Sequence, residues 1–264
     1  MKQRFHKRKG ATLTYLLVFA LGFLLASGIF IEYNLLNTNN TPTGNLIKNT
    51  PAITEPTRAE ANMIAISENT KKAVMGKIIV EIVDGSSATL VDINPFVETD
   101  IQESATTAAE YAKTHSNRNL ENKSIIYRFE VNRNTILVGG PSAGTAMAVA
   151  TIAAIEDKQL KSDALVTGAI TADGLIHPVG SIFEKVKGAG KHNISLFLIP
   201  SGQKETIIFE KKLVTDDILG FRIVRIKQIP TKIDVITYAK ENYNMTIKEI
   251  SAIDEAYNEL IISQ

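Results

Sequence analysis

Ser142 is the side chain of this sequence most suited to act as a nucleophile. It lies in ILVGGPSAGTAM, residues 136–147, where β-branched apolar residues pass through glycines into an alanine-rich helical pattern. A serine hydroxyl is a weak nucleophile until a neighbouring base accepts its proton. The chemistry of the chain therefore depends on which side chain serves as that base.

A histidine base would indicate an α/β-hydrolase that acts on esters. Residues 140–144 match the G-x-S-x-G elbow of that fold, in which an acid and then a histidine follow the serine. Only His177 and His192 follow Ser142, and we predict another strand and two helices after them without a histidine. A Ser-His-Asp triad is thus the less favoured alternative.

Several other classes of site find little support. The four histidines are scattered, no H-E-x-x-H pattern occurs and the chain has no cysteine, so we expect no metal site and no disulfide. No G-x-x-x-x-G-K-[ST] pattern is present, so we expect no P-loop ATPase in this sequence and no cofactor. Beyond its basic N-terminus the chain is mildly acidic, which gives no electrostatic reason to expect nucleic-acid binding.

The elements around Ser142 predict one domain over residues 61–264. Strand patterns cover 77–93 (two strands around an Asp84-Gly85 turn), 124–131, 135–140, 164–180, 194–200 and the region near 221–226. Helix patterns cover 100–115, 142–159, 181–193, about 231–243 and about 246–262. Ser181 and Glu184 fit a capping box, and Asn193 fits a left-handed C-cap. This order predicts an α+β fold, with a mixed α/β sheet and packed helices.

The N-terminal region predicts a single membrane anchor. Residues 11–31 carry no charge, and as a helix they would span about 31 Å, which matches a hydrocarbon core. The basic residues that precede them favour a cytoplasmic tail over residues 1–10 and a domain outside the cell membrane. The alternative is a signal peptide that is cleaved near residues 26–28, which would make the protein secreted. Residues 32–60, rich in Asn, Thr and Pro, predict a flexible linker.

Three blocks of the sequence, in order, resemble the Lon protease catalytic domain. They are IQESATTAA (101–109), GGPSAGTAM (139–147) and the stretch from Thr167 to Pro200, TGAITADGLIHPVGSIFEKVKGAGKHNISLFLIP. More narrowly, the chain is similar to archaeal membrane-anchored Lon-like proteases that lack the ATPase module. The resemblance implies a Lon-protease-domain fold (ribosomal protein S5 domain 2-like) and, because Lon-type domains form rings, a homo-oligomer.

The resemblance also implies roles for individual residues. It makes Ser142 the nucleophile and Lys185 the general base, with Thr167 beside the lysine. On physical grounds, Gly140 lets the substrate and the backbone approach closely. Glu103 is either an ordinary surface acid of its helix or a group that positions the substrate. The sequence departs from the family at Gly139, where many Lon enzymes have an acid, and in the preceding strand, which lacks the histidines that some of them have.

Physical chemistry supports lysine as a base only under strict conditions. The pKa of a lysine, about 10.4 in water, must fall by several units, and burial lowers it by penalising the charged form. Ile182, Val186 and Ala189 form an apolar helix face that could dock Lys185 against a core, although by sequence alone Lys187 is its equal. Backbone N–H groups at the helix start after Ser142 could hold an oxyanion.

The sequence therefore predicts a membrane-anchored serine endopeptidase without its own ATPase. Its partners would be unfolded or flexible protein and peptide segments, the lipid bilayer through residues 11–31, and copies of itself. The alternative from another functional class is a catalytically inactive binding or scaffold module that keeps the same fold and tether.

Overall fold

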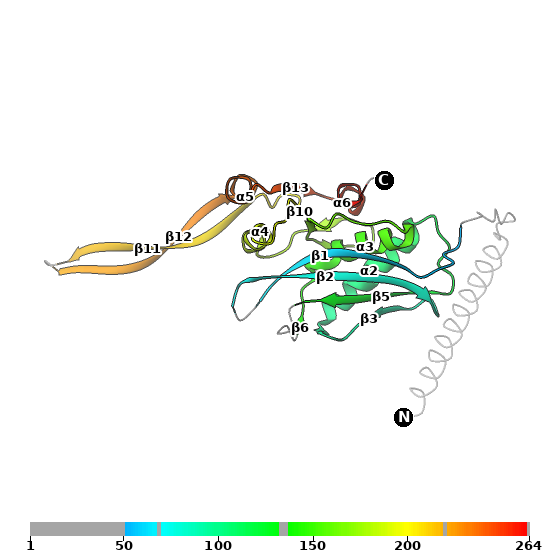
Figure 1. The fold of residues 1–264 in the computed structure, drawn as a ribbon. Helices are drawn as coiled ribbons and strands as arrows, with labels where there is room; N and C mark the ends of the chain where they lie inside the picture. Colours follow the sequence, from blue (N-terminus) through cyan, green and yellow to red (C-terminus); the bar gives the residue numbers. More distant parts are fainter. Residues whose placement is uncertain (1–50, 68–69, 132–136, 219–220, 263–264) are drawn as a thin grey trace, which may run out of the picture. The chain divides into compact units, whose positions relative to one another are not determined.

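The computed structural model describes residues 51–67, 70–131, 137–218 and 221–262 (Figure 1). The predicted tail, the anchor at 11–31 and residues 32–50 of the predicted linker lie outside these ranges. Within the ranges, no helix is both long and apolar enough to cross a membrane.

A seven-stranded mixed sheet forms the centre of the domain. In spatial order its strands are β13 (Thr246–Ile250), β10 (Leu196–Pro200), β7 (Ala164–Val166), β1 (Thr57–Ile66), β2 (Ala73–Asp84), β5 (Lys123–Glu130) and β3 (Thr89–Val91). β1, β2 and β5 are antiparallel neighbours, whereas β7, β10 and β13 run parallel to one another. The mixed sheet that the sequence predicts is therefore confirmed.

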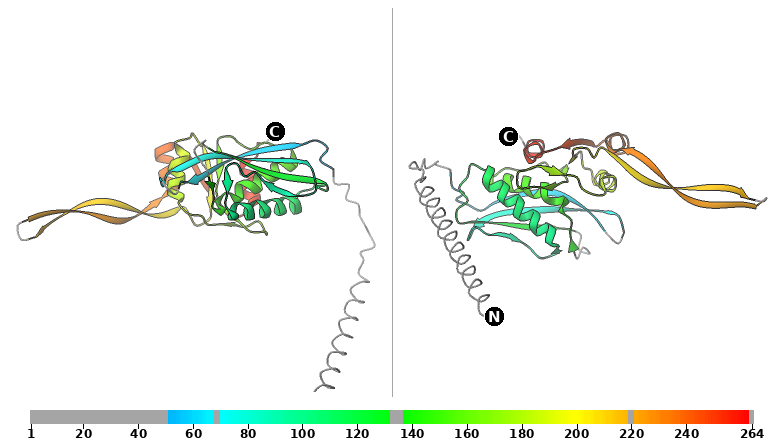
Figure 2. Two further views of the ribbon diagram at one scale, coloured as in Figure 1. Left: turned by 90° about the horizontal axis from the view of Figure 1, so that it is seen from below. Right: turned by 180° about the vertical axis from the view of Figure 1, so that it is seen from behind.

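Helices cover both faces of this sheet (Figures 1 and 2). α2 (Thr99–His115) and α3 (Gly144–Glu156) pack with the larger core cluster, which α6 (Ile253–Leu260) joins. α4 (Ile182–Gly190) and α5 (Val235–Tyr243) belong to a second cluster. Side chains alternate along a strand, so Met63 of β1 contributes to the first cluster and Ile64 to the second.

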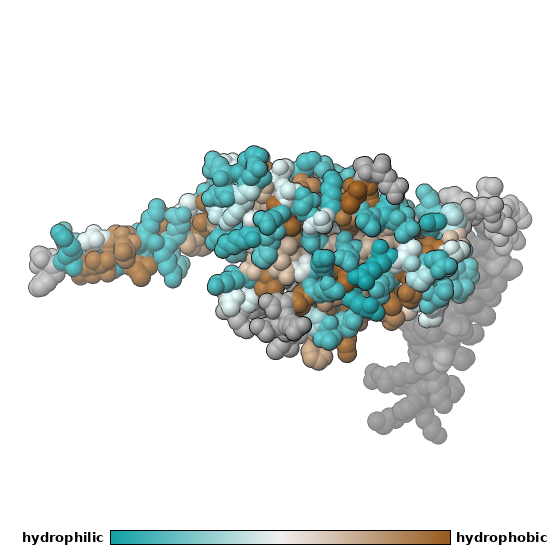
Figure 3. Space-filling view, viewed as in Figure 1, coloured by the Kyte–Doolittle hydropathy of each residue, from teal (hydrophilic) through white to brown (hydrophobic). Residues whose placement is uncertain are grey.

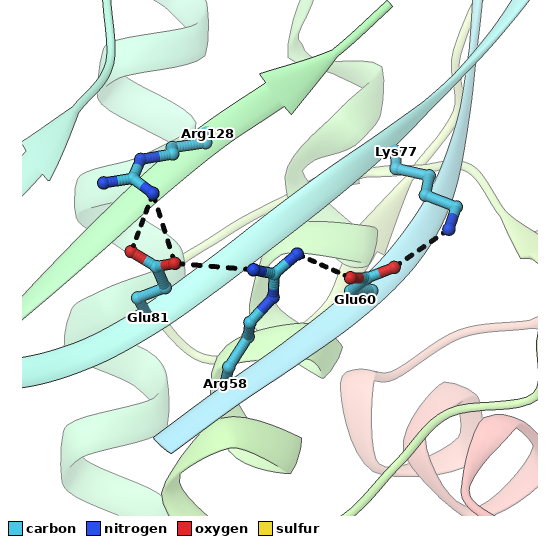
Figure 4. A network of polar contacts seen from close by, with 5 residues as sticks. All are labelled: Arg58, Glu60, Lys77, Glu81 and Arg128. Carbon is cyan, nitrogen blue, oxygen red and sulfur yellow. Dashed lines mark hydrogen bonds and ion pairs between the residues drawn. The ribbon is translucent and has the colours of Figure 1, made fainter. Parts of the chain in front are cut away.

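A charged network occupies the outer face of β1, β2 and β5 (Figure 4). Arg128 and Arg58 both contact Glu81, at 3.1 Å and 3.7 Å, and Arg58 also pairs with Glu60 at 2.7 Å. Lys77 lies 2.9 Å from Glu60, and this hydrogen bond is the main reason that the pKa of Glu60 is lowered. Exposed ion pairs of this kind add little stability. The network marks the solvated part of a face that α4 covers further along β1, at Ile64.

A long hairpin extends from the domain beside α5 (Figure 1). β11 (Glu205–Ile218) pairs antiparallel with β12 (Phe221–Asp234) along its whole length. Among the described residues of the hairpin, Ile208 and Ile233, near its base, pack against the second core cluster. Figure 3 shows brown patches on the arm. The large apolar side chains exposed on β11 and β12 are Ile207, Phe209, Leu213, Ile223, Val224 and Ile226. The sequence predicts a strand near 221–226 but not this arm.

Two short ribbons and one 3-10 turn surround Ser142. β4 (Phe96–Val97) pairs parallel with β6 (Leu137–Val138), and β8 (Ala169–Ile170) pairs antiparallel with β9 (Ile176–His177). The turn η1 (Pro141–Ala143) follows β6 and leads directly into α3.

The structure corrects the predicted boundary of the domain and one predicted helix. β1 begins at Thr57 and Ile53 is buried, so the end of the predicted linker 32–60 belongs to the folded domain. The helix predicted over 246–262 begins only at Ile253, because residues 246–250 form β13, which pairs with β10. Ile247 and Ile250 point to opposite faces of this strand and pack in the second and the first core cluster, respectively.

Three further corrections concern local geometry. The strand after the Asp84-Gly85 turn, β3, pairs with β5 instead of β2. Ser181 precedes α4, but its φ of 60° is left-handed and its side chain caps nothing. A capping serine needs an extended backbone to reach the helix N–H groups, so the predicted capping box is wrong. Asn193 is left-handed as predicted, but the C-cap of α4 is Lys191.

Candidate active site

Ser142 lies half-buried in η1, between a strand end and the start of α3. The chain reaches it through Gly140, whose φ is 89°. A Cβ at Gly140 would meet nothing within 4 Å, so lack of space is not the reason for a glycine there. The reason is the backbone conformation, which other residues rarely adopt. The sharp change of direction at Gly140 presents Ser142 at the N-terminal end of α3.

The segment after β7 holds this turn in place. The N–H of Gly168 donates to the carbonyl of Ser142 at 2.9 Å, and the N–H of Thr145 donates to the carbonyl of Gly168 at 3.0 Å. The hydroxyl of Thr145 donates to the same carbonyl at 3.0 Å. Two segments that are 23 residues apart in sequence are thus joined at Ser142 and at Thr145.

Lys185 reaches the same place from α4. Its side chain is buried, with 3% of the residue exposed, and its Nζ donates to Oγ1 of Thr167 at 2.9 Å. The hydroxyl of Thr167 in turn donates to the carbonyl of Ser142 at 3.1 Å. A continuous chain of hydrogen bonds therefore connects the lysine amine to the residue that bears the candidate nucleophile.

The packing of α4 explains why Lys185 points inward. A Cβ at Gly188 would lie 2.2 Å from Cβ of Ala73 and 2.9 Å from Cδ1 of Ile64, so this glycine lets the helix approach β1 and β2 closely. Lys187 instead is half-buried, with its Nζ 5.3 Å from the centre of the Phe183 ring. The structure thus separates two lysines that the sequence could not.

Burial changes the acid–base behaviour of Lys185. Removal from water penalises the ammonium form and lowers the pKa of Lys185 to about 8. About a tenth of the amines are then neutral at pH 7. A neutral amine that donates one N–H to Thr167 keeps a lone pair, which can accept a proton.

The remaining predicted residues have different surroundings. Glu103 is exposed on α2, and its role in placing a substrate stays a prediction. Gly139 is packed against Glu98: a Cβ at Gly139 would lie 1.9 Å from the carboxylate oxygen Oε2 of that residue. No motif in the sequence marks Glu98, and its one indirect signal is the glycine at position 139, where the sequence departs from the resemblance.

The histidines of the described residues make other contacts. Nδ1 of His192 lies 2.9 Å from the carbonyl of Gly188, one turn back in α4. His115 stacks on Tyr111 with 3.9 Å between ring centroids, and His177 is exposed on β9. No hydrogen bond observed among the described residues joins a histidine to Ser142, so the geometry gives no support to a Ser-His-Asp triad.

Comparison with known proteins agrees with this site. Residues 73–234 match the family described as Lon protease (S16) C-terminal proteolytic domain. The match covers more than half of the chain, which therefore belongs to this family, as the three sequence blocks imply.

Curated relatives share part of this domain. Lon protease 1 of Sorangium cellulosum is 34% identical over 107 residues, which are 38% of this chain and 13% of the relative. Lon protease of Mesomycoplasma hyopneumoniae is 29% identical over 132 residues, 49% of this chain and 15% of the relative. Lon protease of Phenylobacterium zucineum is 44% identical over 62 residues, which are 24% of this chain and 8% of the relative. This chain thus spans only a small part of the length of these relatives.

The burial of Lys185 predicts a pH-dependent effect on stability. The folded-state pKa of about 8 lies below the ordinary value of 10.5, so the unfolded chain binds the extra proton between these values and stability rises with pH across that window. We expect Lys185→Met to stabilise the domain by up to about 3 kcal/mol below pH 8, with the gain shrinking as the pH approaches 10.5. Urea unfolding of both proteins at pH 7 and pH 10 measures this, and an equal difference at the two pH values would contradict it.

Proposed function

We propose that this protein is a membrane-anchored serine endopeptidase in which Ser142 is the nucleophile and Lys185 the general base. The observation on which the proposal rests is the hydrogen-bond chain from the buried Nζ of Lys185 through Thr167 to Ser142. Membership of the Lon proteolytic-domain family supports the same reaction class.

The proposed reaction begins with the neutral amine of Lys185. It accepts the proton of the Ser142 hydroxyl while Oγ attacks the peptide carbonyl, and the N–H groups at the start of α3 stabilise the oxyanion that forms. The C–N bond then breaks as the ammonium of Lys185 gives its proton to the leaving amine. Water attacks the acyl-enzyme after losing a proton to Lys185, and that proton returns to Oγ of Ser142 when the acid product leaves.

Thr167 positions the base in this scheme. Its hydroxyl accepts one N–H of Lys185 and donates to the carbonyl of Ser142. This double contact fixes the amine relative to the serine, and accurate placement of reacting groups is a major part of the rate of such reactions. Thr167 thus acts through Lys185 instead of touching the substrate.

The substrate class follows from the sequence around the site. No P-loop pattern occurs in this chain, so we propose that it cuts unfolded or flexible segments without ATP hydrolysis of its own. Residues 11–31 are the proposed anchor, and a homo-oligomer is the proposed assembly. An inactive scaffold is the competing function, but such a protein gains nothing from burying a lysine amine beside Thr167.

Substitution of the two reacting residues tests the proposal. Because the serine and its base act as one unit, we expect Ser142→Ala and Lys185→Met each to lower casein cleavage at least about 10³-fold. His177→Ala and His192→Ala serve as controls and are expected to retain activity. Cleavage is measured with purified full-length protein in detergent, without ATP.

Four results would overturn parts of this proposal. Full activity of Lys185→Met would exclude the lysine as the base, and loss of activity in His177→Ala would favour the hydrolase alternative. Absence of any cleavage by the unmodified protein would favour the scaffold. Degradation of a stably folded protein by the pure enzyme would exclude the restriction to unfolded segments.

Thr167 provides a second prediction with a matched control. Thr167→Val keeps the side-chain shape but removes the acceptor for Nζ, whereas Thr167→Ser keeps the hydroxyl. We expect the valine variant to lose roughly 10²-fold in kcat with little change in KM, and the serine variant to lose much less. Equal activity of the two Thr167 variants would exclude the positioning role.

The unmodified enzyme should also show a defined pH dependence. Its kcat/KM should rise with pH through about 8, as the amine of Lys185 becomes neutral.

The proposed anchor predicts a defined orientation in the membrane. With basic residues before the apolar run, the N-terminus should stay inside and the domain outside. External protease added to intact cells is expected to digest the domain, and an epitope tag at the N-terminus should be protected. Release of the domain from membranes by alkaline carbonate washing would instead favour a cleaved signal peptide.

A further inference from the structure

The loop that presents Ser142 is in contact with an acidic residue from another part of the chain. β4 and β6 run parallel, with Phe96 opposite Leu137 and Val97 opposite Val138. Continuing this register by one residue brings Glu98 opposite Gly139. The side chain of Glu98 extends over this glycine: a Cβ at Gly139 would lie 1.9 Å from its Oε2, 2.2 Å from its Cδ and 2.9 Å from its Cγ.

The space, and not the backbone, excludes a side chain at Gly139. Positive φ values among the described glycines occur at Gly140, Gly174 and Gly202, so the conformation of Gly139 lies outside the left-handed region. The three atoms nearest to a Cβ at Gly139 all belong to the Glu98 side chain. A side chain at this position, three residues before Ser142, would therefore require Glu98 to move.

The backbone of Glu98 is held firmly. Glu98 is the N-cap of α2, and its carbonyl accepts from the N–H groups of Ile101 at 3.1 Å and Gln102 at 3.4 Å. The backbone of Glu98 is thus held by a helix of 17 residues, and its side chain contacts the loop at Gly139. This contact connects the start of α2 with the loop that precedes Ser142.

The charge of Glu98 has a favourable place in the fold. η1 and α3 together begin at the Ser142 turn, and neither has an acidic residue in its first turn. A negative charge near a helix N-terminus is stabilising, because it faces the positive end of the helix dipole. Glu98 supplies that charge from outside the helix.

We propose that Glu98 is a positioning residue for Ser142, whose carboxylate occupies the space that a side chain at position 139 would fill. This inference rests on the proposed function and deepens it. Glu98 is exposed, and it acts on the geometry of the loop. Burial is the cause of the lowered pKa of Lys185, so the pH dependence of the reaction should not depend on Glu98.

Relocation of the carboxylate tests this inference. The readout is the rate at which a fluorophosphonate probe labels Ser142 in the full-length protein, together with kcat and KM on an unfolded substrate. We expect Glu98→Ala to slow labelling and lower kcat roughly ten- to hundredfold, with the pH midpoint unchanged. Gly139→Asp alone should also be slow, because two carboxylates would compete for one space. The double variant Glu98→Ala/Gly139→Asp should recover to within about threefold of the unmodified protein, since the two sites are coupled.

Controls separate this inference from the proposed function. Glu110→Ala removes the same charge from the exposed face of α2, three turns away, and is expected to match the unmodified protein. Circular dichroism and Tm of every variant identify any that fail to fold. Normal labelling of Glu98→Ala, or a double variant no faster than Gly139→Asp, would overturn the positioning role. If Ser142→Ala were still active, the proposed function itself would fail, whatever the Glu98 variants do.

Discussion

The burial of the Lys185 amine is the constraint on which the rest of the site depends. A lysine in water is almost entirely protonated at neutral pH and cannot act as a base. Close docking of α4, which Gly188 permits against Ala73 of β2, removes the amine from water and lowers its pKa to about 8. The same burial lowers the stability of the fold, and a buried amine without a hydrogen-bond partner would lower it further. Thr167 offsets part of that cost by accepting one N–H.

The loop of Ser142 is held from two directions by segments that are distant in sequence. On one side, Thr167 and Gly168 bond to its carbonyl from the end of β7. On the other, Glu98 packs over Gly139 from the start of α2. Between these supports the chain turns sharply at Gly140. Presentation of the hydroxyl is therefore a property of the sheet and its helices together.

The sequence predicts local elements well and their partners poorly. The periodicity of 100–115 and 181–193 identifies α2 and α4, because apolar spacing on a helix is a local property. The pairings of β3 with β5 and of β4 with β6 depend on register between distant segments, so the contact of Glu98 with Gly139 could not be predicted from spacing. Apolar residues of the β11–β12 hairpin are exposed on an arm outside the core. A prediction that assigns apolar residues to buried positions therefore does not identify this arm.

The separation of Glu98, the acid, from Lys185, the base, has a physical reason. An anion next to Nζ of Lys185 would favour the ammonium form and raise the pKa, which would cancel the effect of burial. Desolvation is the cause of the lowered pKa, and the polar partner of the amine is the neutral hydroxyl of Thr167. An acid can therefore help this reaction only where it touches the loop and not the amine. Glu98, on the loop at Gly139 and otherwise in solvent, meets that condition.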